Sequence, residues 1–398
     1  MELDPYSEEF FNGAWETYRY LRDEEPVHHN ERLNFWALSR YDDVSAALRD
    51  WSTFSSAQGT MMDQLDTPGF SAEMMPGWLL VYDPPDHSRL RRLAAAAFSP
   101  RSVQDLTTAV DAAVTSAFDS VAGSKEFDLV ESVVTRIPAE VMYDLMGIPL
   151  QGREHAMTLT DAFLYAGDGT GGDINAARIA AMMELAEFLM SIVREKRVKP
   201  GNDIMSRMIE AHFLDDEGKE QRLNDTEMCY YLLLLLAAGT ETTAKLTCGA
   251  VVGLHSNPDQ WKLLLDDPRL VKAAALEAGR HESPVQILGR RCVKETTLHG
   301  TTIPAGANVY LLLGSANRDD RVYPNPGSFD LTRSFDPPPV TYGWGPHLCL
   351  GKHLALLEVE TTLDQLRARW PHFQIDESRL QRVHGFQVFG WSSVPVFV

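Results

Sequence analysis

The chain has 398 residues, of which 44% are hydrophobic and 23% are charged. This composition is typical of a folded globular protein and excludes disordered, collagen-like and rod-shaped coiled-coil chains. The formal net charge of −20 argues against a nucleic-acid partner, because binding phosphates requires a dominant basic surface.

The N-terminal segment predicts no targeting signal and no membrane anchor. Residues 1–25 are acidic with scattered aromatics, and they lack a basic stretch followed by an apolar one. The most apolar run, 229–239, is about half as long as the ~20 residues that a membrane-spanning helix needs. We therefore expect a cytoplasmic protein whose four cysteines remain reduced.

The first half of the chain predicts one early strand followed by helices. The aromatic stretch 33–41 favours a strand, and a long irregular loop at 54–82 would need a functional reason to exist. Asp83, followed by two prolines, favours a helix start with Asp83 as its cap. Helices are expected at 42–48, 89–98, 110–118, 130–145, 176–193 and 203–212.

One helix is predicted to be unusually long. Asn224 and Glu227 have the spacing of a capping box, and the helical pattern continues to His255. Some 30 residues of helix span roughly 45 Å. Because apolar residues lie almost all round it, we expect this helix to pass through the middle of the protein.

The C-terminal part predicts mixed structure. A strand is expected at 308–313, proline-rich turns follow, a helix covers 352–369, and the tail is formed by strands and turns. We find no linker and no internal repeat in the sequence. The prediction is a single domain, residues 1–398, that is mainly α with small β-sheets.

The strongest local motif is Tyr342-Gly-Trp-Gly-Pro-His-Leu-Cys-Leu-Gly351, directly before the helix predicted at 352–369. Glycines allow positive φ angles and a close approach of the backbone to a flat ligand. Cys349, beside a helix N-terminus, lies near free N–H groups that stabilise a thiolate. A lone cysteine is usually only a small buried apolar residue, but this setting favours a thiolate ligand.

These residues resemble the cytochrome P450 family, whose heme-binding loop is Phe-Gly-x-Gly-x-His-x-Cys-x-Gly, with Tyr342 in place of phenylalanine. The resemblance implies a cytochrome P450 fold with a long central helix crossing over heme b, and Cys349 as the axial ligand of its iron. The remaining loop residues that it implies for heme binding are Tyr342, Gly343, Gly345 and Gly351.

A second family motif, Ala238-Gly-Thr-Glu-Thr-Thr243, lies within the long helix. Alone it would be weak, because helical threonines often bond back to a carbonyl. Beside the cysteine motif it implies that Thr242 holds water or dioxygen and that Glu241 relays protons. Ala238 and Gly239 would let the ligand approach the helix.

A third motif consists of Glu277 and Arg280, which share one helix face. In the family this pair is buried and joined to a downstream arginine, for which Arg333 is the candidate. We assign all three a structural role. Gly279 stands where the family has a larger residue, which costs about 1 kcal/mol unless packing requires glycine.

Heme carries two propionates, so a buried heme needs cations at its edge. By the resemblance, His87, Arg91, Arg290 and His347 take this role. Arg291 is the alternative to Arg290.

The resemblance implies a monooxygenase that inserts one atom of dioxygen into a hydrophobic small molecule by hydroxylation, epoxidation or O-demethylation. Electrons would come from a separate ferredoxin with an NAD(P)H-dependent reductase, docking on a basic patch formed by Arg89, Arg92 and Lys352. We expect a monomer. The alternatives are a peroxide-using peroxygenase, a coupling or desaturating enzyme, and a non-catalytic heme-thiolate sensor.

The substrate pocket is expected to be mostly apolar. Gln286 or Gln387 would orient one polar group of the substrate. The stretch 167–172 matches a dinucleotide-binding pattern, but no strand leads into it, so we interpret it as a connection between helices. The predicted lining residues are Met61, Met62, Leu234, Ala237, Gln286, Leu288 and Val388.

Overall fold

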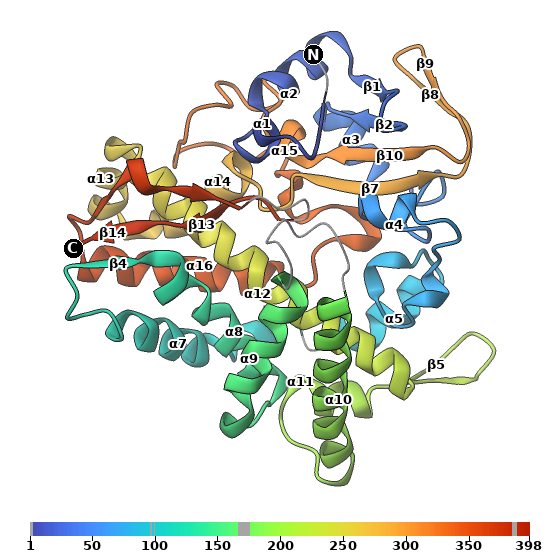
Figure 1. The fold of residues 1–398 in the computed structure, drawn as a ribbon, viewed down its shortest axis with the longest axis horizontal. Helices are drawn as coiled ribbons and strands as arrows, with labels where there is room; N and C mark the ends of the chain where they lie inside the picture. The colour runs from blue at the N-terminus through green and yellow to red at the C-terminus, as the bar shows by residue number, and fades with distance from the viewer. Residues whose placement is uncertain (1–2, 96–97, 99, 166–175, 384–387) are drawn as a thin grey trace.

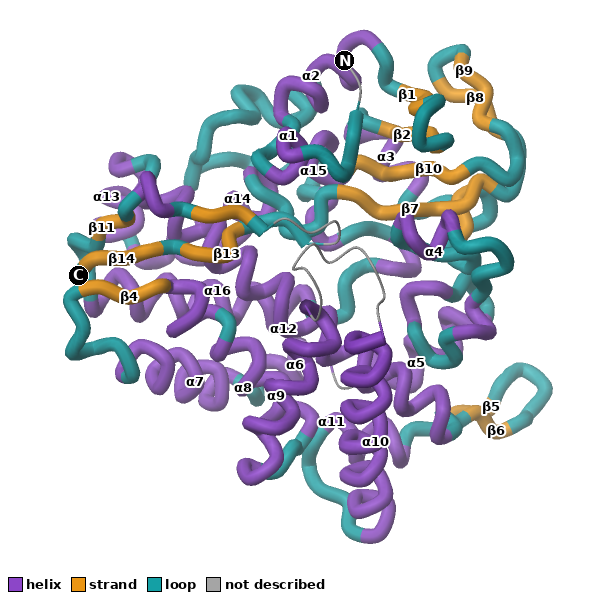
Figure 2. The backbone as a smooth tube through the Cα atoms, in the orientation of Figure 1, coloured by secondary structure: helices purple, strands orange, loops and turns teal. Residues whose placement is uncertain are grey.

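The computed structural model describes residues 3–95, 98, 100–165, 176–383 and 388–398. Helices dominate it (Figures 1 and 2). The helices are α1 (Glu8–Phe11), α2 (Trp15–Glu24), α3 (Tyr41–Ala47), α4 (Met62–Asp66), α5 (Asp86–Ala95), α6 (Pro100–Gln104), α7 (Thr107–Asp119), α8 (Arg136–Met146), α9 (Leu150–Tyr165), α10 (Ala176–Val198), α11 (Ile204–Glu210), α12 (Asp225–His255), α13 (Pro258–Asp266), α14 (Val271–His281), α15 (Leu313–Ala316) and α16 (Lys352–Arg369).

The strands form small sheets. The largest described sheet has the order β1-β2-β10-β7-β3, in which only β2 and β10 pair in parallel, and a second has the order β11-β14-β4. The strands are β1 (Val27–Asn30), β2 (Phe35–Leu38), β3 (Phe54–Ser55), β4 (Glu126–Asp128), β5 (Phe213–Leu214), β6 (Glu220–Gln221), β7 (Ile287–Cys292), β8 (Thr296–Leu298), β9 (Thr301–Ile303), β10 (Asn308–Leu312), β11 (Gln374–Ile375), β12 (Gln381–Arg382), β13 (Trp391–Ser393) and β14 (Pro395–Phe397).

Helix α12 crosses the middle of the molecule (Figure 1). The Asn224 side chain accepts from the Glu227 N–H, and the Glu227 carboxylate accepts from the Asn224 N–H. The helix continues for 31 residues to His255, so both predicted ends are confirmed. The five-stranded sheet lies to one side of α12 with the N-terminal helices, and α7 to α11 lie to the other.

Three predictions of local structure need correction. The early β structure is a pair, β1 and β2, rather than one strand. Helix α9, with 16 residues, was not predicted. The Asp83 carboxylate does not cap α5, since it accepts hydrogen bonds from the Ser55 hydroxyl and the Ser56 N–H.

The apolar core is largest around α12, where side chains from α7, α8, α10, α14 and α16 pack together. Smaller clusters cover the two faces of the five-stranded sheet. Among the described helices, none combines the length and the apolar character needed to cross a membrane.

Candidate active site

The loop before α16 folds as its glycines require. Gly343 has a φ of +69° and Gly345 one of +68°, which are conformations that side chains rarely adopt. A Cβ at Gly345 would also lie 2.8 Å from the Leu48 carbonyl oxygen. The Cys349 N–H donates to the Tyr342 carbonyl at 2.8 Å, so the loop turns back on itself and presents Cys349 just before α16.

The surroundings of Cys349 act on its thiol in two directions. Its side chain is accessible to water, yet the protein encloses it closely enough that burial raises the pKa of the thiol. The N–H groups of Gly351 and Lys352 and the positive charges of Arg91 and Lys352 lower that pKa. These groups favour a thiolate over a thiol, as binding to a metal requires.

The four residues predicted to hold propionates lie together beside this loop. The imidazole rings of His87, on α5, and His347 have centroids 4.3 Å apart. Arg91, one turn further along α5, donates to the Leu348 carbonyl at 2.6 Å. Burial lowers the pKa of His347, and the nearby charge of Arg290, on β7, lowers it further. Three separate segments therefore bring these basic groups to one place.

This cluster carries more hydrogen-bond donors than partners. The Nε2 atoms of His87 and His347 are buried, and in the described part of the chain neither has a partner. Burial, reinforced by Arg91, lowers the pKa of His87 to about 4. Burial also lowers the pKa of Arg290 to about 10, and Asp83 is the acid that opposes this. A buried group of donors and cations is costly unless an anion balances it.

Arg291 does not belong to this cluster. It lies on the opposite face of β7 from Arg290, and its guanidinium donates to the carbonyls of Gly306 and Leu65 at 3.0 and 2.7 Å. Of the two candidates, Arg290 is therefore the one near His347. The donor set of His87, Arg91, Arg290 and His347 fits the carboxylates of a heme, and its role stays a prediction.

Helix α12 is accessible near its two ends, and its central part is buried except for one short stretch. Residues 231–236 and 243–251 are buried, whereas Ala238 is exposed and Glu241 and Thr242 are partly exposed. These residues lie three and four positions apart, so they share a helix face. The predicted oxygen-handling residues thus lie in the accessible stretch of the central part of this helix, together with Ala237 and Gly239.

Thr242 is oriented by its own helix. Its hydroxyl donates to the Ala238 carbonyl at 2.8 Å, which leaves the oxygen lone pairs as acceptors. Gly239 has a different observed reason to be glycine than the predicted one, because a Cβ there would lie 2.9 Å from the Met142 sulfur. The glycine therefore makes room for α8, and contact of Gly239 with a ligand stays a prediction.

The Glu277, Arg280 and Arg333 side chains come together in the core. Two Glu277–Arg280 contacts measure 2.7 Å between fully buried side chains, and Arg333 Nε lies 3.2 Å from Glu277 Oε1. Arg280 also donates to backbone carbonyls at 2.8 to 3.2 Å. A Cβ at Gly279 would lie 3.1 Å from Thr341 Cγ2, which supplies a packing reason for that glycine.

The predicted pocket residues differ in how exposed their side chains are. Leu234 and Val388 are nearly buried, while Met61, Ala237 and Leu288 are partly exposed. Leu288 shares a face of β7 with Arg290, since the two lie two positions apart on the strand. All five of these residues have apolar side chains.

Two pocket assignments conflict with the observed packing. Met62 is 2% exposed and packs in the cluster that contains Leu65 and Tyr310. The Gln286 amide donates to the Ser283 carbonyl at 2.7 Å, and its Oε1 atom lies against Gly314. Both side chains are directed into the protein core, which a linear sequence does not reveal.

Gln387 and residues 167–172 lie outside the described residues. The basic docking patch predicted from Arg89, Arg92 and Lys352 carries less free positive charge than expected, because Arg89 forms an ion pair with Glu227. Arg92 is exposed, with its guanidinium 4.1 Å from the centre of the Phe213 ring.

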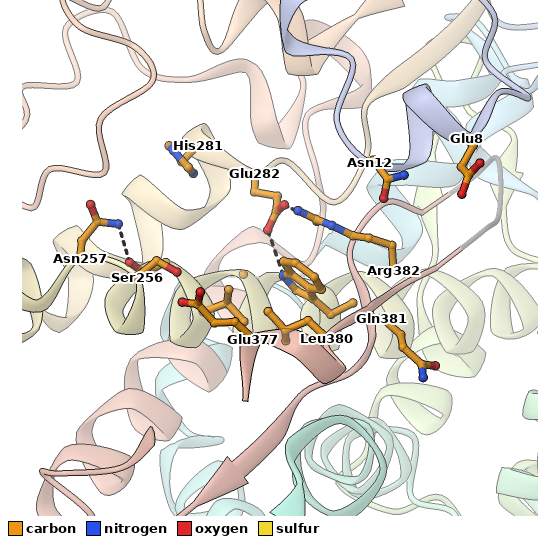
Figure 3. Close-up of a pocket in the computed structure, with 14 residues that line it drawn as sticks. Glu8, Asn12, Ser256, Asn257, His281, Glu282, Glu377, Leu380, Gln381 and Arg382 are labelled. Atoms are coloured by element: carbon orange, nitrogen blue, oxygen red, sulfur yellow. Dashed lines mark hydrogen bonds and ion pairs between the residues drawn. The ribbon is translucent and has the colours of Figure 1, made fainter. Parts of the chain in front are cut away.

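A cleft of about 810 Å³ opens elsewhere on the molecule (Figure 3). It lies beside the C-terminal half of α12, where Gly249, Val252 and Ser256 line it together with Glu282 and Arg382. None of the residues predicted to bind heme or oxygen is among its described lining residues. Its size therefore does not make it the active site.

Two residues that contact the cluster of His87, Arg91, Arg290 and His347 were not predicted from the sequence. The Tyr82 carbonyl accepts from His347 and counteracts the fall of its pKa, and Asp83 faces Arg290. Asp83 precedes two prolines and matches a helix cap, so its sequence pattern pointed to another role.

Comparisons with known proteins bear on this arrangement. Residues 265–370 match the family model described as cytochrome P450. The provisionally named cytochrome P450 123 of Mycobacterium tuberculosis is 34% identical over 396 residues, which cover 100% of this chain and 96% of that protein. The chain belongs to the cytochrome P450 family.

Solved cytochrome P450 structures agree with the fold. The bacillaene polyketide synthase cytochrome P450 PksS of Bacillus subtilis superposes with a TM-score of 0.88 at 27% identity, covering 100% of this chain and 99% of PksS. The hydroxylase HmtN, from himastatin biosynthesis, gives a TM-score of 0.84 at 30% identity, covering 97% and 96%. As a cytochrome P450, the chain is a heme-thiolate monooxygenase that binds iron protoporphyrin IX.

Proposed function

We propose that this cytochrome P450 inserts one oxygen atom into a hydrophobic small molecule, using Cys349 as the iron ligand and Glu241 and Thr242 to handle protons. The observation that carries the proposal is the accessible stretch of α12. Between Tyr231 and Val252, the accessible residues of α12 are 237–239, Glu241 and Thr242, and this stretch contains both predicted oxygen-handling residues.

The heme, when bound, supplies the iron at which dioxygen is reduced. His87, Arg91, Arg290 and His347 would hold its propionates, since their unpartnered donors and positive charges match two carboxylates. Burial raises the pKa of Cys349 and the N–H groups of Gly351 and Lys352 oppose this rise, so the bound iron would supply the remaining positive charge that keeps the sulfur as a thiolate.

Thr242 and Glu241 would divide the proton work between them. Because the Thr242 hydroxyl donates to Ala238, its oxygen is left to accept a hydrogen bond from a protonated oxygen group in the space before it. Glu241 lies one residue earlier and is partly exposed, so its carboxylate can exchange protons with that space. This pair favours dioxygen chemistry over the peroxide-driven alternative.

The substrate class is proposed from the apolar residues that remain in the predicted lining. Met61, Leu234, Ala237, Leu288 and Val388 offer carbon atoms and no charge. A similar structure from Bacillus megaterium, with 27% identity and a TM-score of 0.85, was solved with testosterone. A hydrophobic molecule of small to medium size is consistent with both observations.

Turnover with a ferredoxin and an NAD(P)H-dependent reductase tests this proposal. A compound library is first screened for the change of iron spin state that follows displacement of water. For a compound that causes this change, we expect the wild type to consume one dioxygen for each product molecule formed. In Thr242→Ala, about tenfold more of the consumed dioxygen should be released as hydrogen peroxide, since an oriented acid–base group accelerates proton transfer by at least tenfold. If the protein instead forms product from hydrogen peroxide alone, and Thr242→Ala forms as much product as the wild type, the protein is a peroxygenase. Binding of compounds without any product would identify a sensor.

A further inference from the structure

Lys245 is a buried lysine close to the oxygen-handling residues. It follows Glu241 by four positions on α12 and therefore shares its helix face. It is only 8% exposed, and its Nζ atom donates to the Trp391 carbonyl, at the start of β13, at 2.9 Å. Within the described chain this ammonium forms no ion pair and its partner is a backbone carbonyl, although burying an unpaired charge is costly. We therefore expect the buried Lys245 ammonium to have a role in the protein that compensates for the cost of its burial.

The aliphatic part of Lys245 is in tight contact with the same segment. Gly390 has a φ of +149°, and a Cβ there would lie 2.9 Å from the Lys245 Cβ. The backbone of this segment can approach α12 so closely only because Gly390 has no side chain. Val388, which we assign to the substrate pocket, lies two residues earlier.

The other side of the segment is fixed by a polar cluster that lines the 810 Å³ cleft (Figure 3). The Trp391 indole donates to Glu282 Oε2 at 3.2 Å, and the Arg382 guanidinium lies 3.6 Å from the centre of the Trp391 ring. Arg382 and Glu282 form an ion pair, and both are largely buried. The segment is thus held by Glu282 and Arg382 from the cleft side and by Lys245 from α12.

We propose that Lys245 is a positioning residue that holds the 388–391 segment against α12 and thereby sets the affinity of the pocket for ligands that reach Val388. The inference rests on the proposed function, because it takes Val388 as part of the substrate pocket. Lys245 touches neither the reacting atoms nor the substrate in this account. It acts through the Trp391 carbonyl and the backbone at Gly390.

The experiment compares two ligands of the heme iron in the Lys245→Met holoenzyme. Methionine keeps the aliphatic volume but removes the ammonium and its hydrogen bond. Imidazole occupies only the space next to the iron, whereas 4-phenylimidazole extends further into the pocket. We expect the Kd of 4-phenylimidazole to rise about fivefold, the effect of one lost hydrogen bond, and the Kd of imidazole to change less than twofold.

Controls separate positioning from general damage. Lys262→Met removes a lysine that is exposed on α13 and should change neither Kd. Gly390→Ala perturbs the same contact from the opposite side and should weaken 4-phenylimidazole selectively. Its effect should not add to that of Lys245→Met, because contacting residues are coupled.

Hydrogen exchange supplies a readout that needs no ligand. The Val383 N–H donates to the Gly390 carbonyl at 2.9 Å, and the Phe389 N–H donates to the Pro284 carbonyl at 2.7 Å. Both amides should exchange about fivefold faster in Lys245→Met, because the segment opens more often. Unchanged exchange, or an equal change in both Kd values, would overturn the inference. If the wild type instead lacks the heme-thiolate spectrum, it is the proposed function that fails.

Discussion

Arg290→Met should have opposite effects on the heme-free and the heme-loaded protein. Burial lowers the pKa of the fully enclosed Arg290 from its ordinary value to about 10. This difference corresponds to roughly 3 kcal/mol that the folded chain loses by carrying the charge. At pH 7, below both values, the cost is fully present, and it is relieved only as the pH rises through about 10.

Methionine removes this cost together with one hydrogen bond, from Arg290 to the Gly289 carbonyl at 2.7 Å. Since such a bond contributes about 1 kcal/mol, the heme-free variant should gain roughly 2 kcal/mol in free energy of unfolding. In the loaded protein, the same substitution removes a cation that we place against a propionate. A lost charge-assisted bond of about 1.5 to 3 kcal/mol should make heme dissociate roughly 10 to 100 times faster.

The assay combines urea unfolding of the heme-free protein with the rate of heme transfer to an excess of a heme-accepting apoprotein. Arg291→Met is the matched control, because that guanidinium donates to the Gly306 and Leu65 carbonyls instead. It should destabilise both forms and leave heme transfer unchanged. If Arg290→Met destabilises the heme-free protein and leaves heme retention intact, the cluster is a structural feature and the reasoning is refuted.

The remaining predictions concern a core ion pair, a titrating histidine and the electron donor. Glu277→Gln should lower the free energy of unfolding in urea by about 3 to 5 kcal/mol, because it leaves the buried charge of Arg280 unbalanced. Glu187→Gln, the control at an exposed ion pair, should lower it by less than about 0.5 kcal/mol. Burial lowers the pKa of His87 from 6.5 to about 4, so His87 should contribute roughly 3 kcal/mol to the stability that the heme-free protein loses between pH 6.5 and pH 4. His347 and His281, whose pKa values are also lowered, add to this loss, so His87→Gln should lose roughly 3 kcal/mol less than the wild type rather than nothing. An identical pH profile would contradict the assignment. Arg92→Glu should slow reduction by a ferredoxin without changing azole affinity, and equal loss of both would rule out a docking role.

Sequence patterns predicted the parts of the site that depend on local chemistry. The limits of α12 follow from its capping box and from the residues after His255, because a helix end is determined by its immediate neighbours. The positive φ angles of Gly343 and Gly345 likewise follow from residue type. The grouping of Glu277 with Arg333 came from the family resemblance, since 56 residues separate them.

Features that depend on tertiary packing were not predictable from the chain. The orientation of Gln286 depends on Gly314 in α15, and that of Met62 on Tyr310 in β10. Strand β14 pairs with β4, about 270 residues earlier, and no local pattern specifies such a partner. The pairing of Arg89 with Glu227 similarly removed one cation from the patch that the sequence suggested.

The central claim is that Cys349 ligates the heme iron, and the spectrum of the reduced protein under carbon monoxide tests it most directly. A thiolate ligand shifts the Soret band to the red, so we expect the wild type to show this band and Cys349→Ser, reconstituted with heme, to lose it. Cys248→Ser is the control, because that cysteine is fully buried on α12 and should leave the band unchanged. A red-shifted band in Cys349→Ser, or its absence from the heme-loaded wild type, would contradict the claim.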